Sequence, residues 1–103
     1  MTLGDIRTLL VSIDPHISHY FSVQEDKDYS YWEETQRLPL TSDQRHDEGW
    51  HFYVHRFTKD EFDPVARRMF EALDGNDRIT VSHTIDFDRD AMMIHHIFEC
   101  EGY

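Results

Sequence analysis

Residues 79–87 of the chain read ITVSHTIDF, and this stretch decides the class of fold. Apolar residues and His83 alternate with small or polar residues from one end to the other. Successive side chains of a β-strand point to opposite faces, so this period of two predicts a strand with one buried face. The turn 88–90 and a further apolar run, Met92 to Glu99, follow directly. Together they predict a hairpin near the end of the chain.

An amphipathic helix is predicted immediately before this hairpin. Its apolar residues recur three and four positions apart, which places them on one side of a helix. They are Phe62, Val65, Ala66, Met69, Phe70 and Leu73. Two starts remain open, a capping box of Thr58 with Glu61 and an Asp63 cap followed by Pro64. Gly75 supplies the stop.

The beginning of the chain, Thr2 to Ile13, predicts a second amphipathic helix. Its apolar stripe is Ile6, Leu9, Leu10 and Ile13. Thr2 with Asp5 resembles an N-terminal cap, and Asp14 before Pro15 ends the helix because a residue preceding proline avoids the α region. The short apolar stretch Ile17 to Val23 stays open between a strand and a loop packed on the core.

Two further strands lie between the helices. Tyr29 to Gln36 (YSYWEETQ) and Trp50 to Phe57 (WHFYVHRF) are rich in the aromatic and β-branched residues that favour strands. The connection Arg37 to Gly49 is longer than the roughly 4–6 residues usual in compact domains, so we expect it to project as a functional loop. The order α-β-β-α-β-β predicts an α+β fold, with two helices on a mostly antiparallel sheet of about four strands.

Length and charge narrow the function classes. The chain has 103 residues, which suits one domain spanning 1–103, and carries a net charge of −11. Such acidity argues against binding nucleic acid or an anionic membrane surface, because both need clustered Lys and Arg. A single cysteine, Cys100, excludes an intrachain disulfide and favours a reducing compartment. With no secretion signal recognisable in the first residues, we expect a soluble protein made in the cytoplasm.

Histidines invite a metal hypothesis, which their spacing does not favour. They stand at His16, His19, His46, His51, His55, His83, His95 and His96. His51 and His55 share a strand face but lie about 13 Å apart there, and adjacent His95 and His96 point to opposite faces. A cluster assembled by the tertiary fold stays open. The spacing favours histidines distributed over the faces of a sheet.

A calcium-binding loop is also not supported by the sequence. Asp86, Asp88 and Asp90 resemble the start of a calcium loop, but Ala91 and Ile97 occupy the positions that need Gly and Glu. These acids are better interpreted as a hairpin turn.

Catalytic side chains are equally poorly placed. Cys100 lies between Glu99 and Glu101, whose charges raise the pKa of a thiol. Glu33 and Glu34 are neighbours in a strand and point apart, so they cannot converge on a substrate. We therefore predict no enzyme, no catalytic residue, no metal site and no cofactor.

The aromatic residues of the two central strands are more informative. Alternation sends about half of them to the sheet face away from the helices, where a lone domain would leave them in water. They either line the core or are covered by another subunit or protein. The candidate interface residues are Tyr29, Tyr31, Trp32, Trp50, Tyr53 and Phe57.

In order and spacing, the motifs of the chain resemble a known family. The segments are Tyr31-Trp-Glu-Glu34, a polar loop with Asp43, 49–58 (GWHFYVHRFT), the helix Glu61 to Leu73, 84–90 (TIDFDRD) and 94–98 (IHHIF). Together, from Leu9 to Phe98, they resemble the small tail-terminator, or tail-completion, proteins of long-tailed bacteriophages and prophages.

The resemblance implies a structural role in the virion. Such proteins form a ring, usually a hexamer, at the head-proximal end of the tail tube, where they stop tube polymerisation and join tail to head. The implied partners are further copies of the chain, the tail tube protein and a head-completion or connector protein, while DNA passes through without specific binding and no membrane is involved. The implied location is the virion tail, and the host cytoplasm during assembly.

Three hypotheses about function stay open, and the net charge is relevant to the first of them. They are a tail terminator, another head–tail joining or minor tail protein such as a stopper, and a non-phage interaction module or small His-dependent metal enzyme. In a ring, a negative lumen would repel passing DNA; alternatively, the charge merely keeps the domain soluble. The acids expected to face such a channel are Asp43, Asp47, Glu48, Asp86, Asp88 and Asp90.

Overall fold

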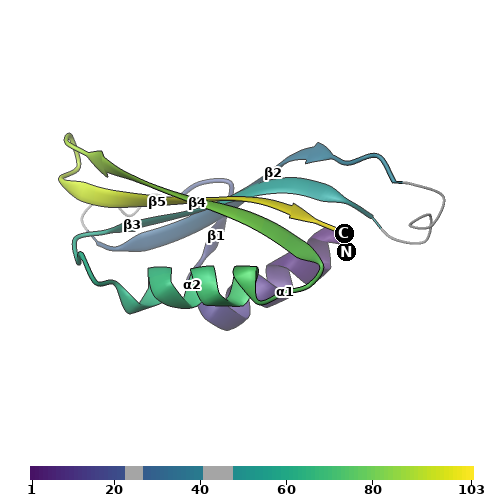
Figure 1. Cartoon of the computed structure of the whole chain (residues 1–103). Helices are drawn as coiled ribbons and strands as arrows, with labels where there is room; N and C mark the ends of the chain where they lie inside the picture. Colours follow the sequence, from purple (N-terminus) through teal and green to yellow (C-terminus); the bar gives the residue numbers. More distant parts are fainter. Residues whose placement is uncertain (23–26, 41–47) are drawn as a thin grey trace.

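The computed structural model describes residues 1–22, 27–40 and 48–103 of the chain. These residues form α1 (Leu3–Ile13), β1 (Ser18–His19), β2 (Tyr29–Arg37), β3 (Trp50–Thr58), α2 (Pro64–Asp74), β4 (Ile79–Asp88) and β5 (Met93–Gly102). Both helices lie on the same side of a single sheet (Figure 1). The predicted α+β class is confirmed. We call the opposite side of the sheet, which neither helix covers, the open face.

The sheet contains five strands in the order β1-β2-β3-β5-β4. The pairs β2–β3, β3–β5 and β5–β4 are antiparallel, whereas β1 runs parallel to β2. The expected four strands in the order α-β-β-α-β-β were therefore wrong by one strand, and the sheet is mixed. Only Ser18 and His19, which pair with Tyr31 and Trp32, form the additional strand. Two residues are too few to show a period of two in the sequence.

Helix α1 begins and ends where the sequence predicted. The Thr2 side chain accepts a hydrogen bond from the Asp5 backbone N–H (3.0 Å), and the Asp5 carboxylate accepts one from the Thr2 N–H (2.8 Å). This reciprocal capping box satisfies two backbone donors that have no partner inside the helix. Three members of the predicted stripe, Ile6, Leu10 and Ile13, are buried against the sheet.

Helix α2 settles the open question about its start. The Asp63 side chain accepts hydrogen bonds from the N–H groups of Val65 and Ala66, and Pro64 is the first helical residue. The alternative box of Thr58 with Glu61 was wrong, because the Thr58 hydroxyl donates to Asp28 instead. Phe62 consequently precedes the helix, and its expected place on the buried stripe was wrong as well, since 82% of it is exposed.

The hydrophobic core lies between the helices and the helix-side face of the sheet. Its largest fully buried side chains include Trp32 of β2, Phe52 of β3 and Phe98 of β5. The domain measures 46 × 24 × 22 Å. In Figure 1 the β4–β5 turn and the start of β3 lie at opposite ends of its long axis. Among the described residues, no helix is long and apolar enough to cross a membrane.

Candidate functional site

Aromatic rings and imidazoles stack across the strands of the open face. Tyr29 stacks on Phe57 with ring centroids 4.8 Å apart, Tyr31 on His55 at 4.4 Å, and Phe57 on His95 at 4.0 Å. Tyr53 shares this face, and its hydroxyl donates to the Glu99 carboxylate (2.7 Å). Four of the six candidate interface residues, Tyr29, Tyr31, Tyr53 and Phe57, are thus brought together. Phe57 is itself buried by its neighbours, with 8% of it exposed, so the surface of this cluster is formed by the tyrosines.

The two tryptophans do not belong to this cluster. Trp32 points to the helix side and is only 2% exposed, so it belongs to the core and offers no surface to a partner. Trp50 is half-buried and packs against the edge of the core. Its indole N–H donates to the Glu48 carboxylate (3.0 Å), and the Arg37 guanidinium lies 4.5 Å from the centre of its ring. Its contacts are local to the start of β3.

Histidines connect three strands of the open face. Nδ1 of His55 and Nε2 of His95 lie 2.8 Å apart and share a hydrogen bond, and Nε2 of His55 lies 3.2 Å from the Glu33 carboxylate. Burial lowers the pKa of His55, although Glu33 opposes the effect. Burial and the neighbouring His55 lower the pKa of His95 to about 4, against the opposing charges of Asp86 and Asp88. Both imidazoles are therefore neutral at pH 7, where they hold β2, β3 and β5 together.

This network predicts acid sensitivity. In the unfolded chain a histidine binds its proton near pH 6.5, whereas His95 in the folded chain binds it only near pH 4. Between these values the unfolded state binds more protons, so stability is fully present above about pH 6.5 and falls as the pH falls. We expect the melting temperature to decline from pH 6.5 to pH 5, as measured by circular dichroism.

The matched variants separate His95 from the other titrating groups. His95→Gln keeps a side chain that can hydrogen-bond His55 but does not titrate, so its melting temperature should decline less over the same interval. His16 is exposed on the loop after α1, and His16→Gln should retain the wild-type decline. Equal pH dependence in wild type and His95→Gln would remove the network as the cause.

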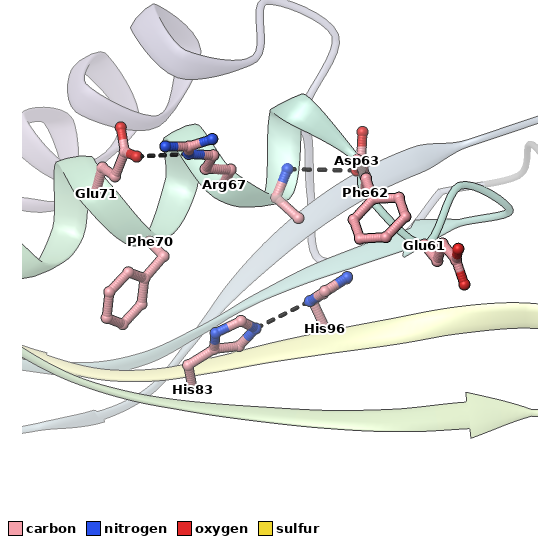
Figure 2. A pocket seen from close by; sticks show the side chains of 9 residues that line it. Glu61, Phe62, Asp63, Arg67, Phe70, Glu71, His83 and His96 are labelled. Carbon is pink, nitrogen blue, oxygen red and sulfur yellow. Dashed lines mark hydrogen bonds and ion pairs between the residues drawn. The ribbon is translucent and has the colours of Figure 1, made fainter.

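A groove opens on the other side of the sheet, between α2 and the β4–β5 hairpin. It has a volume of about 510 Å³. His83 and His96 line it on the sheet side, and the helix side contributes apolar residues and charged ones: Phe62, Ala66 and Phe70, with Glu61, Asp63, Arg67 and Glu71. Figure 2 shows both phenylalanines extending from the helix side toward the two imidazoles. The helix wall of the groove therefore combines apolar and charged side chains, and the sheet wall carries ring nitrogens.

One nitrogen in this groove lacks a partner. Nε2 of His83 and Nδ1 of His96 lie 2.9 Å apart and share a hydrogen bond. Nε2 of His96 is buried and has no hydrogen-bond partner among the described residues, although only 8% of His96 is exposed. In Figure 2 this nitrogen points toward Phe62 and Asp63. A buried polar atom without a partner carries a desolvation cost of about 1–3 kcal/mol, which a ligand group could offset.

Exposed apolar side chains extend the groove along the sheet edge. Ile85 is 59% exposed and Phe87 is 46% exposed, and both belong to the outermost strand β4. With Phe62 and Phe70 they form what we call the β4-edge patch. At the opposite edge, just after β1, Tyr20 and Phe21 are also exposed, and we call them the β1-edge patch.

The candidate channel acids do not form one cluster. Glu48 lies beside the start of β3, whereas Asp86, Asp88 and Asp90 lie at the β4–β5 turn, at the other end of the sheet. Asp43 and Asp47 fall outside the described residues. Asp88 accepts hydrogen bonds from the backbone N–H groups of Asp90 and Ala91, which confirms the interpretation of this segment as a hairpin turn.

The paired histidines were missed by the sequence reasoning. It placed His51 and His55 on one face and His95 and His96 on opposite faces, and both placements are confirmed by their different partners. Which strands are neighbours, however, is what brings His55 to His95 and His83 to His96, and residue spacing does not contain that information. Among the described residues, no group of three or more His, Cys, Asp or Glu could hold a metal ion.

Cys100, Glu33 and Glu34 lie in surroundings that agree with the sequence analysis. Burial, aided by Glu99, raises the pKa of the Cys100 thiol to about 12, which makes it unreactive near neutral pH. Glu33 lies beside His55 on the open face, whereas Glu34 contacts Tyr20 and His19 on the helix side. The two carboxylates therefore diverge, as predicted.

No protein-family model matches the chain, and no curated protein matches it.

Proposed function

We propose that the chain is a structural protein of a long-tailed phage or prophage that forms a ring at the head-proximal end of the tail tube. There it ends tube polymerisation and joins the tail to the head. The observation that carries this proposal is the presence of apolar patches at both edges of one sheet, the β4-edge patch and the β1-edge patch. A closed ring requires each copy to present two different surfaces that fit one another.

The state of strand β4 supports assembly with another chain. Over its ten residues, Ile79–Asp88, it pairs with β5 on one side without any register shift and contains neither Lys nor Pro. Outer strands normally carry charged residues, Pro or a bulge, because an unprotected edge recruits further strands. The acidic residues of β4, Asp86 and Asp88, lie only at its end beside the turn. An outer strand this long and regular, beside exposed Ile85 and Phe87, is expected to be covered in the working state.

The charge is compatible with a ring that DNA traverses. At −11 per copy, the chain offers phosphates no cluster of positive charge, so passing DNA would not be retained. The partners in this proposal are further copies in a hexameric ring, the tail tube protein on one side and a head-completion or connector protein on the other. The protein acts in the virion tail after assembly in the host cytoplasm.

Deleting the gene from the parent phage tests the proposal directly. We expect electron microscopy of lysates to show overlong or ragged tails beside filled heads without tails, since neither termination nor joining can occur. Supplying the wild-type protein from a plasmid is the control and should restore tails of uniform length. Normal tails attached normally to heads in the deletion lysate would refute the tail-terminator function.

A further inference from the structure

We infer that the ring contact is heterologous, with the β1-edge patch of one copy seated in the groove between α2 and β4 of the next copy. In this arrangement Phe21 enters the groove between Phe62 and Phe70. The inference depends on the proposed ring and names the surfaces that would join its subunits. Its occupant is a second copy of this chain.

The residue before Phe21 adopts an unfavourable backbone conformation. Tyr20 has φ of 77°, a left-handed conformation that is unfavourable for a residue with a large side chain. It is held there by its N–H, which donates to the Trp32 carbonyl (2.7 Å), and by stacking of its ring on His19 at 4.0 Å. The consequence is that Phe21, 69% exposed, projects from the edge instead of packing on its own domain. The strained backbone at Tyr20 and the exposure of Phe21 are both explained if the next copy of the chain binds the Phe21 side chain.

The groove has the size to receive this segment, and two of its lining residues are phenylalanines. Its volume of about 510 Å³ lies within the range of roughly 300–1,000 Å³ typical of binding pockets. Phe62 and Phe70 offer rings to an incoming ring, since aromatic pairs gain about 0.5–1.5 kcal/mol beyond area burial. The unpartnered Nε2 of His96 belongs to the sheet wall of the groove, opposite Phe62 and Phe70.

The His96 nitrogen fits a peptide group in either tautomer. When His96 donates through Nδ1 to His83, its Nε2 is an acceptor; when it accepts there, Nε2 carries the proton and is a donor. The backbone beside an inserted Phe21 contains both N–H and C=O groups, so it can satisfy either form. Insertion would therefore remove the one buried side-chain nitrogen or oxygen without a partner among the described residues.

The opposed edges make the contact directional. The patches lie at the two outer strands of a single sheet, so the receiving copy still presents its own Phe21 to a third. Because every copy is acidic, long-range charge opposes association and the apolar contact must drive it. Added salt screens that repulsion, so self-association should strengthen with ionic strength, the reverse of a contact held by opposite charges.

Cross-linking between two single-site variants tests the direction. Ser22→Cys places a thiol beside Phe21, and Glu61→Cys places one beside Phe62, so both apolar partners remain intact. Mixed in equal amounts with a short bis-maleimide, the two variants should give a mixed dimer, while neither alone should cross-link above background. Thr8→Cys, exposed on α1, replaces Ser22→Cys in the control mixture. The native Cys100 is buried and does not compete.

Sedimentation of the full-length protein supplies the second measurement. Phe21→Ser should raise the dissociation constant of self-association about 10- to 100-fold, the effect of losing one buried aromatic side chain, and Phe21→Leu should raise it less. If wild type forms rings but the mixture cross-links no better than the control, this contact is wrong and the proposed function survives. Cross-linking of Ser22→Cys alone would show a symmetric contact and also overturn it. If wild type stays monomeric both alone and on tail tubes, both proposals fail.

Discussion

Replacing Arg56 with Met is expected to lower the free energy of unfolding by about 3–5 kcal/mol, because it leaves buried carboxylates without their counter-charge. Arg56 lies on the helix side of β3 and is buried, as is its main partner Asp63, which precedes α2. The guanidinium Nε donates to the Asp63 carboxylate (2.7 Å), and a second nitrogen donates to the Ser30 hydroxyl (3.2 Å). This contact ties the sheet to the first turn of the helix.

Asp63 makes the loss larger than that of one ion pair. Burial raises the pKa of its carboxyl, but the hydrogen bond and charge of Arg56 outweigh this effect, and the net shift is downward. The same carboxylate caps α2 through Val65 and Ala66. Without Arg56, the cap must either carry an uncompensated buried charge or take up a proton. Folding and helix capping are thus coupled through a single guanidinium.

Two further variants separate the cost of an unpaired buried charge from the cost of losing an ion pair. Arg56→Met with Asp63→Asn removes the unpaired charge while keeping a side-chain oxygen for the cap, so it should recover a substantial part of the lost stability. Arg67→Met breaks the exposed pair with Glu71 (2.9 Å) and should cost about 0–1 kcal/mol. Urea unfolding followed by circular dichroism measures all three. A loss below about 1 kcal/mol for Arg56→Met would show that the buried pair contributes little.

Local sequence signals were enough to predict most elements of the fold. The alternation at 79–87 and the stripe of α1 each depend on one segment, and such a segment forms the same element wherever it packs. Strand β1 depends instead on a partner, since Ser18 and His19 are a strand only because Tyr31 and Trp32 lie beside them. The prediction for Phe62 was wrong for a related reason, because the Asp63 cap starts the helix at Pro64, two residues after Phe62.

The candidate surfaces were less predictable than the elements. The histidine pairs required the strand order, in which β5 lies between β3 and β4 instead of at the edge. Arg56 could not be assigned to the core from its strand alone, since an arginine is buried only when a distant carboxylate meets it. The groove likewise exists only where α2 faces His83 and His96 of the β4–β5 hairpin, and no single segment contains that information.

The two tryptophans show how little a strand sequence says about burial. Trp32 and Trp50 were both predicted to be interface residues, yet the structure places them differently. Trp32 follows Tyr31, which lies on the open face, and alternation therefore sends its indole under the helices. There it packs in the core with Ile6 and Leu10 and stacks on His19 with ring centroids 4.0 Å apart. Trp50, at the beginning of β3, keeps part of its indole in water.

Trp32→Ala is accordingly expected to lower the free energy of unfolding by about 3–5 kcal/mol, the cost of a large cavity in a closely packed core. Trp50→Ala, the matched control, loses partial burial, one hydrogen bond and the Arg37 contact, and should lose about half as much or less. Urea unfolding monitored by circular dichroism avoids the altered fluorescence of both variants. A core residue costs stability before any partner is present, whereas an interface residue costs only assembly. If the Trp32→Ala monomer is as stable as wild type but fails to assemble, Trp32 is an interface residue. That result would contradict its burial beneath α1.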